Sequence, residues 1–378
     1  MGKLPTGTFL LVSCALLAFL MVSAAPACSG GQKPTTTTTS PATTGRGRIT
    51  LQGAGATFPY PLYSKMFSEY GKISNVDINY QSIGSGGGIQ QITNRTVDFG
   101  ASDGILTDAQ LAAAPASAPG SNPLLHIPMT SGAEAIIFNL PGASLPAGTT
   151  LRLAPDVLAD IFLLKIKKWN DPRIAALNTG ATLPATDIAV VHRSDGSGTT
   201  YIFTNYLSKV SQEWKDRVGN ATAVRWPGGI GGQGNEGVAG QVSQIPGAIG
   251  YVELAYALQN KLAHAALKNR AGNFVLPSVE SSIAAATGVA LPDDMKVMIT
   301  DSANPGAYPI AGFTWILVYK QQADLVKGQA LMNMLWWAIH DGQKYGPPLY
   351  YAPLSADAVK KAEAIVRSVT YNGQPLVK

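Results

Sequence analysis

Short runs of β-branched and aromatic residues alternate along the chain with stretches whose apolar residues recur every three or four positions. The first pattern is typical of β-strands and the second of amphipathic helices. The strands that we expect span 76–81, 188–192 and 314–319. The helices that we expect span 59–70, 89–94, 155–163, 200–207, 325–340 and 356–369. This alternation predicts an α/β architecture.

The last predicted helix, 356–369, has a capping residue at its start and an apolar face. It follows Ser355, a residue type that caps helix N-termini. One face of the helix collects the apolar residues Val359, Ala362, Ile365 and Val369. We therefore expect this face to lie against the protein core.

The chain begins with the pattern of an export signal. Lys3 precedes an almost wholly apolar stretch at 8–25, which ends in Ala25-Pro26-Ala27-Cys28. A basic start, an apolar run and an A-x-A site together indicate export, so we assign residues 1–27 to the signal.

Processing at this signal has three possible outcomes. Lipid attachment at Cys28 is the outcome that we prefer, because small residues precede it and because Cys14 would leave a second apolar run behind it. Ordinary cleavage after Ala27 would release a soluble protein instead. An uncleaved membrane anchor is the third outcome, since 18 apolar residues approach the ~20 needed to span a bilayer. In each case the rest of the chain lies outside the cytoplasmic membrane, and 28–48, rich in Ser, Thr and Pro, forms a flexible tether.

The charge of the chain is concentrated at its start. The sequence has 28 basic and 23 acidic residues, a net charge of +5. Residues 1–48 hold four basic residues and no acidic one, which leaves 24 basic against 23 acidic residues in 49–378. A nucleic-acid-binding protein would carry its basic charge on the folded domain, so we expect no nucleic-acid partner.

Length and composition indicate a folded protein of moderate size. With 46% hydrophobic and 13% charged residues, the chain can bury sizeable cores. Its 378 residues allow about two domains at ~100–200 residues each. We find no internal repeat and no second low-complexity linker, so two domains would be interwoven.

Sequence signals for a cofactor or a metal ion are weak. The only cysteines are Cys14 and Cys28, and the four histidines are scattered. The G-x-G-x-x-G match at 229–234 follows Trp226-Pro227 rather than a clear strand, and we interpret it as a flexible loop. We expect no cofactor and no metal.

Loops of small residues run into a predicted helix at three places, 53–59, 82–88 and 193–200. Free backbone N–H groups and the positive end of the helix dipole meet at a helix N-terminus, which favours anions there. Glycines let a ligand approach the backbone closely, and hydroxyl groups add donors. Three such loops in one sequence predict a site for a compact tetrahedral oxyanion.

Two charged residues refine this prediction. Arg193 in the third loop supplies charge and a fork of donors, and Asp195 can hold its side chain in place. Asp103 should repel an anion, unless the anion carries a proton that the carboxylate accepts. Hydrogen phosphate carries such a proton and sulfate at neutral pH does not. A site built around a required hydrogen bond can reject an analogue by about 10⁴–10⁵.

At these loops the sequence resembles the phosphate-binding protein of bacterial ABC phosphate transporters, the PstS family. The stretches that match the family are 53–63, 80–103, 166–172, 188–206 and 226–256. The resemblance covers roughly residues 50–350, and its motifs occur in the family's order. Gly86 departs from the family, since relatives often carry a second Ser there.

The resemblance implies a two-lobed periplasmic-binding-protein fold of type II that closes over one phosphate. It implies lobe one at 49–124 plus 308–378 and lobe two at 125–307. It implies phosphate contacts from Thr57, Phe58 (main chain), Ser85, Asp103, Arg193, Ser197, Gly198 and Thr199, with Asp195 supporting Arg193. The implied partners are inorganic phosphate, the membrane permease subunits of an ABC phosphate transporter and the membrane itself through a lipid anchor. We expect a monomer that is not an enzyme.

Two alternative functions would use the same anion cradle. A phosphatase would need a nucleophile with a base, or metal ions, and neither Ser85 nor Ser197 has a base visible in the sequence. A phosphate sensor or adhesin would bind the anion without taking part in transport.

Overall fold

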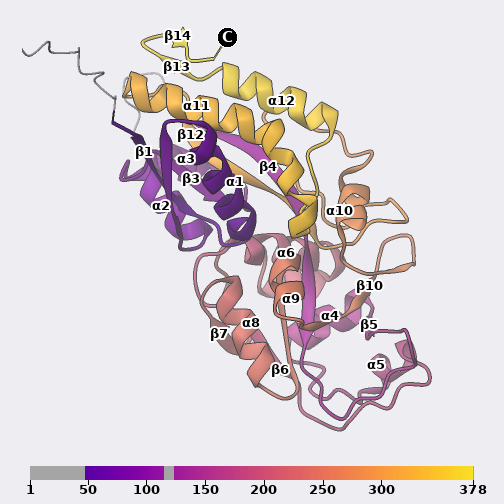
Figure 1. Cartoon of the computed structure of the whole chain (residues 1–378). Helices are drawn as coiled ribbons and strands as arrows, with labels where there is room; N and C mark the ends of the chain where they lie inside the picture. Colours follow the sequence, from indigo (N-terminus) through magenta and orange to yellow (C-terminus); the bar gives the residue numbers. More distant parts are fainter. Residues whose placement is uncertain (1–46, 115–122, 378) are drawn as a thin grey trace, which may run out of the picture. The chain divides into compact units, whose positions relative to one another are not determined.

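The computed structural model describes residues 47–114 and 123–377 (Figure 1). The predicted export signal, Cys28 and the tether up to Arg46 lie outside the described residues. None of the described helices is long and apolar enough to cross a membrane.

The strands are β1 (Ile49–Gly55), β2 (Val76–Ser82), β3 (Phe99–Ser102), β4 (Leu124–Phe138), β5 (Arg152–Leu153), β6 (Ala189–Arg193), β7 (Ile230–Gly232), β8 (Ala248–Glu253), β9 (Ala263–His264), β10 (Ala266–Lys268), β11 (Phe274–Val275), β12 (Ala311–Tyr319), β13 (Thr370–Tyr371) and β14 (Gln374–Pro375). The α-helices are α1 (Tyr60–Ile73), α2 (Ser85–Thr93), α3 (Asp108–Ala113), α4 (Pro155–Phe162), α5 (Pro172–Leu177), α6 (Gly198–Val210), α7 (Gln212–Arg217), α8 (Gly234–Gln244), α9 (Leu254–Gln259), α10 (Val279–Ala286), α11 (Leu325–Ile339) and α12 (Ala356–Arg367). Two 3₁₀ helices are η1 (Asp341–Tyr345) and η2 (Pro347–Leu349).

One large sheet holds most of the strands, in the order β2-β1-β3-β12-β4-β8-β6-β7, with β9 also paired to β4. β1 runs parallel to β2 and β3, and β6 runs parallel to β7 and β8. β4 joins the two groups, because it pairs antiparallel with β12 as far as Ala133 and with β8 from Glu134 onward. In Figure 1, β4 accordingly runs from the region of α11 and α12 to the region of α8 and α9.

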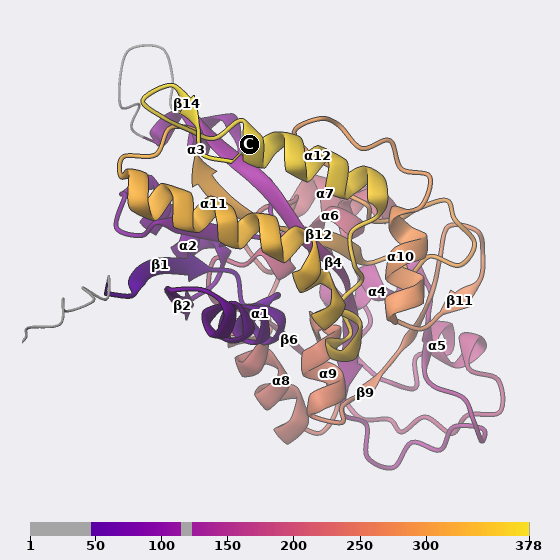
Figure 2. The ribbon, with the colours of Figure 1, turned by 45° about the horizontal axis from the view of Figure 1, so that its top comes forward.

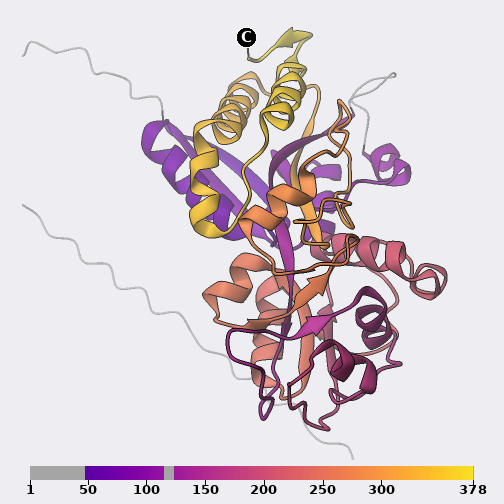
Figure 3. The ribbon, with the colours of Figure 1, turned by 90° about the vertical axis from the view of Figure 1, so that its right-hand side faces the viewer.

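Helices cover the sheet on both sides, which explains why its central strands are buried along almost their whole length. β12 is buried along its whole length, and β4 at all but one position. α2 packs on β1 and β3, while α8 packs on β6 and β8. α11 and α12 lie against one another, with α11 in contact with β1 and α12 in contact with β4, and Figures 2 and 3 show this pair from two further sides. The alternation of strands and helices thus yields the predicted α/β architecture.

All of the predicted strands and helices are present, with boundaries that shift by a few residues. The largest shift is at α2, which begins at Ser85 rather than Ile89, so the small residues at 85–88 form its first turn. In the last helix Ala362 and Ile365 are buried in the core, and Val359 and Val369 pack with the same core. Val359 is only partly buried, and Val369 is buried beyond the helix end.

The expectation of a flexible loop at 229–234 was wrong. Ile230–Gly232 pairs in parallel with β6, and α8 begins directly afterwards at Gly234. A three-residue strand with two glycines has too little apolar pattern to be found from the sequence. This strand and helix bring Asn235 into the site described below.

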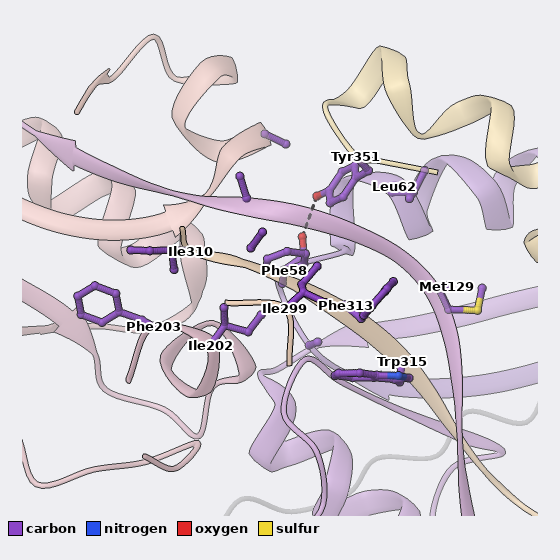
Figure 4. Packing of buried hydrophobic residues seen from close by; sticks show 14 of the residues in the cluster. Phe58, Leu62, Met129, Ile202, Phe203, Ile299, Ile310, Phe313, Trp315 and Tyr351 are labelled. Atoms are coloured by element: carbon purple, nitrogen blue, oxygen red, sulfur yellow. Dashed lines mark hydrogen bonds between the residues drawn. The ribbon is translucent and has the colours of Figure 1, made fainter. Parts of the chain in front are cut away.

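The main hydrophobic core continues beneath the anion-binding loops. Figure 4 shows Phe58 packed among residues from several elements, among them Ile202, Phe313 and Tyr351. Phe58 is fully buried, although it belongs to the connection between β1 and α1. Its side chain therefore anchors that connection in the core, and its main chain becomes part of the site.

Candidate anion-binding site

The ends of four strands bring the predicted loops together. Thr57 follows β1, Ser85 follows β2, Asp103 follows β3 and Arg193 ends β6. Their exposed fractions are 2%, 0%, 1% and 3%, respectively. All of the residues predicted to contact phosphate are buried and lie in one connected cluster.

Two of the loops touch directly. The main-chain N–H of Gly198 donates to Ser85 Oγ at 2.9 Å, and the N–H of Asp103 donates to the same oxygen at 3.3 Å. A Cβ on Gly198 would lie 2.4 Å from Asp103 Oδ2, so only glycine fits there. The second loop turns at Gly84, whose φ of +85° favours glycine.

Three of the helices that start at this cluster carry or follow residues predicted to contact the anion. α1 follows Thr57 and Phe58, α2 starts at Ser85, and α6 starts at Gly198 with Ser197 as its N-cap. The first N–H groups of each helix have no partner within the helix. The cluster therefore offers main-chain donors and three positive dipole ends to an anion.

The hydroxyl groups of the cluster already accept hydrogen bonds from the protein. Ser85 Oγ accepts the two main-chain bonds above, and Ser197 Oγ accepts from the N–H of Thr200 at 3.0 Å. Thr199 Oγ1 accepts from Arg193 Nη1 at 3.2 Å. A hydroxyl that accepts from protein donors still has its own proton to give. The arrangement thus leaves these groups as donors toward a bound anion.

Asn235 also donates to two hydroxyl oxygens of the cluster and so leaves their protons for an anion. The sequence analysis did not identify it as a site residue. Its Nδ2 atom lies 2.7 Å from Thr57 Oγ1 and 3.1 Å from Thr199 Oγ1, and donates to both. Its Oδ1 atom accepts from the N–H of Glu253 at 2.8 Å, which fixes the orientation of the amide. The only signal was its place inside the 226–256 stretch that matches the PstS family.

Arg193 is the buried cation of the cluster. Its Nε donates to Asp195 Oδ1 at 2.8 Å, and its Nη2 donates to Asp195 Oδ2. Burial alone would raise the pKa of Asp195, but the hydrogen bonds and charge of Arg193 outweigh it and hold this pKa below its ordinary value. The pair is therefore ionised, and Asp195 fixes the guanidinium as predicted.

Asp103 is the acceptor among these donors. Both of its carboxylate oxygens are buried without a hydrogen-bond partner among the described residues. Burial raises its pKa from 3.8 to about 7, although the Thr314 and Ser85 hydroxyls and the charge of Arg193 act in the opposite direction. An unpartnered buried carboxylate is costly, and a ligand that donates a proton to it removes that cost.

Two further carboxyl groups lie nearby without adding negative charge. Glu134 and Glu253 are fully buried and face one another across β4 and β8. Burial raises the pKa of each well above its ordinary value, and the negative charge of Asp103 raises both further. Burial thus favours the neutral form of both carboxyl groups, and the ion pair of the cluster is formed by Arg193 and Asp195.

This geometry suits a tetrahedral oxyanion that carries one proton. Donors surround it from three helix starts, several hydroxyls and one guanidinium, while one carboxylate accepts its proton. Within 47–114 and 123–377, no group of three or more His, Cys, Asp or Glu side chains is placed to hold a metal ion. Among the described residues, the hydrogen bonds accepted by Ser85 Oγ and Ser197 Oγ come from main-chain N–H groups, which cannot act as the base that a phosphatase nucleophile needs.

The sequence matches one family model and is similar to curated phosphate-binding proteins over most of its length. Residues 35–330 match the family model described as the PBP superfamily domain. The chain is 46% identical over 338 residues to the phosphate-binding protein PstS of Xylella fastidiosa, which covers 89% of this chain and 90% of that protein. It is 48% identical over 317 residues to the phosphate-binding protein PstS of Pasteurella multocida, with coverages of 83% and 89%.

Solved structures show the same fold at lower sequence identity. The crystal structure of a phosphate-binding protein from Stenotrophomonas maltophilia superposes with a TM-score of 0.66 at 20% identity, covering 86% of this chain and 96% of that one. The architecture is thus the two-lobed periplasmic-binding-protein fold that the sequence led us to expect.

Proposed function

The chain belongs to the PstS family of phosphate-binding proteins, and on this premise we propose that it captures inorganic phosphate outside the cytoplasmic membrane and delivers it to an ABC phosphate importer. The observation that carries the proposal is Asp103, a buried carboxyl group whose two oxygens accept no hydrogen bond from the described residues while donors surround it. Hydrogen phosphate complements this arrangement, because its oxygens accept hydrogen bonds from the donors and its P–OH group donates a hydrogen bond to Asp103.

Capture proceeds by exchange of water for fixed donors. Phosphate loses its hydration shell and gains hydrogen bonds from the ligand residues predicted in the sequence, among which Arg193 supplies the positive charge. These groups are held by other protein contacts, so they need little reorganisation when the anion arrives. The bonds between the Ser85 and Gly198 loops close the protein around the ligand, and the closed form is the one that the permease receives.

We propose lobe one at 49–124 plus 308–378 and lobe two at 125–307, although residues 125–133 of β4 pair with β12 of lobe one, which favours a first boundary later than 124/125. The pairing of β1–β3 with β12, and of β6–β8 among themselves, supports this division. The change of partner along β4 supports a crossover inside that strand, near Ala133 and Glu134.

Export and anchoring complete the proposal. The signal at 1–27 directs the protein out of the cytoplasm, Cys28 carries a lipid, and 28–48 tethers the binding domain to the membrane. The protein acts as a monomer and as a receptor for transport rather than as an enzyme.

Calorimetric titration of the purified protein with phosphate, and separately with sulfate, tests the proposed function. We expect one phosphate per chain, bound at micromolar concentration or tighter, and no heat from sulfate in the same range. The absence of phosphate binding in this range would overturn the proposal. Uptake measured with and without the gene then separates a transport receptor from a sensor, because loss of a receptor abolishes high-affinity uptake.

A further inference from the structure

Two phenol groups hold the carbonyls of consecutive residues in the first anion-binding loop. The hydroxyl of Tyr256 donates to the carbonyl oxygen of Thr57 at 2.6 Å. The hydroxyl of Tyr351 donates to the carbonyl oxygen of Phe58 at 2.7 Å, the bond drawn in Figure 4. Both rings are buried, with 8% and 0% of their surface exposed. The loop is thus held by side chains from two distant parts of the chain.

The bond from Tyr256 determines where the next N–H points. The carbonyl of Thr57 and the N–H of Phe58 belong to one planar trans peptide unit, so they point in opposite directions. The hydrogen bonds of the described residues include none from this N–H, although Phe58 is fully buried. A buried N–H without a partner is costly, which indicates a ligand that accepts from it.

Tyr351 is held in turn by Glu253. Its hydroxyl oxygen lies 3.0 Å from Glu253 Oε2, which also accepts from the N–H of Ala255 at 2.8 Å. A phenol has one proton, and the carbonyl of Phe58 can only accept. The Tyr351 hydroxyl thus lies within hydrogen-bond distance of both the Phe58 carbonyl and Glu253 Oε2, and burial raises the pKa of the Glu253 carboxyl well above its ordinary value. These contacts fix Tyr351 beneath the loop.

We infer that Tyr256 is a positioning residue for phosphate capture, whose hydroxyl aims the N–H of Phe58 at the anion by holding the carbonyl of Thr57. The inference rests on the proposed function, because phosphate is the acceptor for that N–H. Tyr351 and Glu253 hold the following carbonyl and keep the loop from turning.

The contact also joins the two predicted lobes. Tyr256 lies on α9 in the 125–307 segment, whereas Thr57 lies in the 49–124 segment, 199 residues earlier. Opening of the cleft separates the two groups and frees the peptide unit. Loss of the hydroxyl therefore speeds release of phosphate more than it slows capture.

The test compares Tyr256→Phe with wild type and with Tyr308→Phe. Tyr308 is also fully buried, but its hydroxyl has no hydrogen-bond partner among the described residues, so its removal is a matched control. Phosphate affinity comes from calorimetry and the release rate from stopped-flow displacement. Protein labelled with ¹⁵N-phenylalanine reports the Phe58 amide, which is assigned by its loss in Phe58→Leu.

For Tyr256→Phe we expect about tenfold weaker phosphate binding, the effect of one hydrogen bond, with most of the change in the release rate. The downfield shift of the Phe58 amide proton on phosphate addition should be full in wild type and in Tyr308→Phe and reduced in Tyr256→Phe. Wild-type affinity together with a full amide shift in Tyr256→Phe would overturn the inference alone. Failure of wild type to bind phosphate would overturn the proposed function, and the inference with it.

Discussion

The main-chain N–H of Gly198 donates to the side-chain oxygen of Ser85 at 2.9 Å, across 113 residues of sequence. This bond connects the start of α6 to the start of α2, and each helix belongs to a different predicted lobe. Because Ser85 accepts here, its own proton stays available for an anion. One contact thus joins the loops and orients a donor.

Replacement of Asp103 by Asn should reduce discrimination between phosphate and sulfate. The amide no longer offers a carboxylate to the proton of hydrogen phosphate, and it no longer repels an anion without a proton. We expect the ratio of the two affinities to fall by a factor of about 100 or more from the 10⁴–10⁵ that such sites reach. Calorimetry with both anions measures it, and Asp108→Asn, an exposed position, is the control. Undiminished rejection of sulfate would contradict the role of Asp103.

The same variant should change how stability depends on pH. Burial raises the pKa of Asp103 from 3.8 in the unfolded chain to about 7, so between these values the folded protein binds more protons than the unfolded one. The free energy of unfolding of the ligand-free protein therefore falls as pH rises through this window, by up to about 4 kcal/mol at about 1.36 kcal/mol per unit.

In Asp103→Asn that contribution is absent, so the variant should be more stable than wild type above pH 7 and should lose the advantage near pH 4. Urea unfolding between these pH values measures the difference. Glu134 and Glu253 remain in both proteins, but the charge of Asp103 raises the pKa of each, so the difference reports Asp103 together with its coupling to these two carboxyl groups. A constant difference across the window would mean that Asp103 does not titrate there.

Gly198→Ala should abolish tight phosphate binding. The added Cβ would lie 2.4 Å from Asp103 Oδ2 and 2.6 Å from the Asp103 nitrogen, so the two loops must separate. We expect the affinity to fall at least about 100-fold, as for a misplaced binding group. Gly240→Ala is the matched control, because a Cβ there meets nothing within 4 Å and the position lies inside α8. It should bind normally and gain up to about 1 kcal/mol of stability.

Asn235→Ala should weaken phosphate binding without direct loss of a predicted ligand. Its amide keeps the Thr57 and Thr199 hydroxyls as acceptors from the protein, and without it their protons can turn away from the anion. A loss of about 10-fold to 100-fold corresponds to one or two such hydrogen bonds. The control is Asn139→Ala, whose side chain donates to a main-chain oxygen at the surface. Equal affinities for the two variants would show that Asn235 does not orient the site.

Cys28→Ser should separate anchoring from binding. The purified variant is expected to bind phosphate like wild type, since Cys28 lies outside the described binding domain. Mass spectrometry of the mature N-terminus should find lipid on Cys28 in wild type, and cell fractionation should find the variant released from the membrane. An unmodified N-terminal Cys28 in wild type would instead support ordinary cleavage.

Local chemistry made much of the site predictable. A glycine-rich connection before a helix exposes free main-chain N–H groups and the positive end of the helix dipole wherever it occurs. The loops around Thr57, Ser85 and Ser197 could therefore be identified as candidate anion sites from the spacing of their residues alone. The pairing of Arg193 with Asp195, two residues apart, was equally local. Helix boundaries were less accurate, as at Ser85, because small residues favour neither a loop nor a helical turn strongly.

The sequence by itself determined the alternation of strands and helices, the three small-residue loops that we propose bind the anion and the types of donor that they carry, because these follow from neighbouring residues. Only the tertiary structure decided which loops meet, that Asp103 is buried with a pKa near 7, and that Asn235 and Tyr256 hold Thr57 from 178 and 199 residues away. The physical reason is that burial and long-range hydrogen bonds arise only when the chain packs. The residues next to Asp103, Asn235 and Tyr256 in the sequence do not indicate which of them will be buried or which distant partner each will contact.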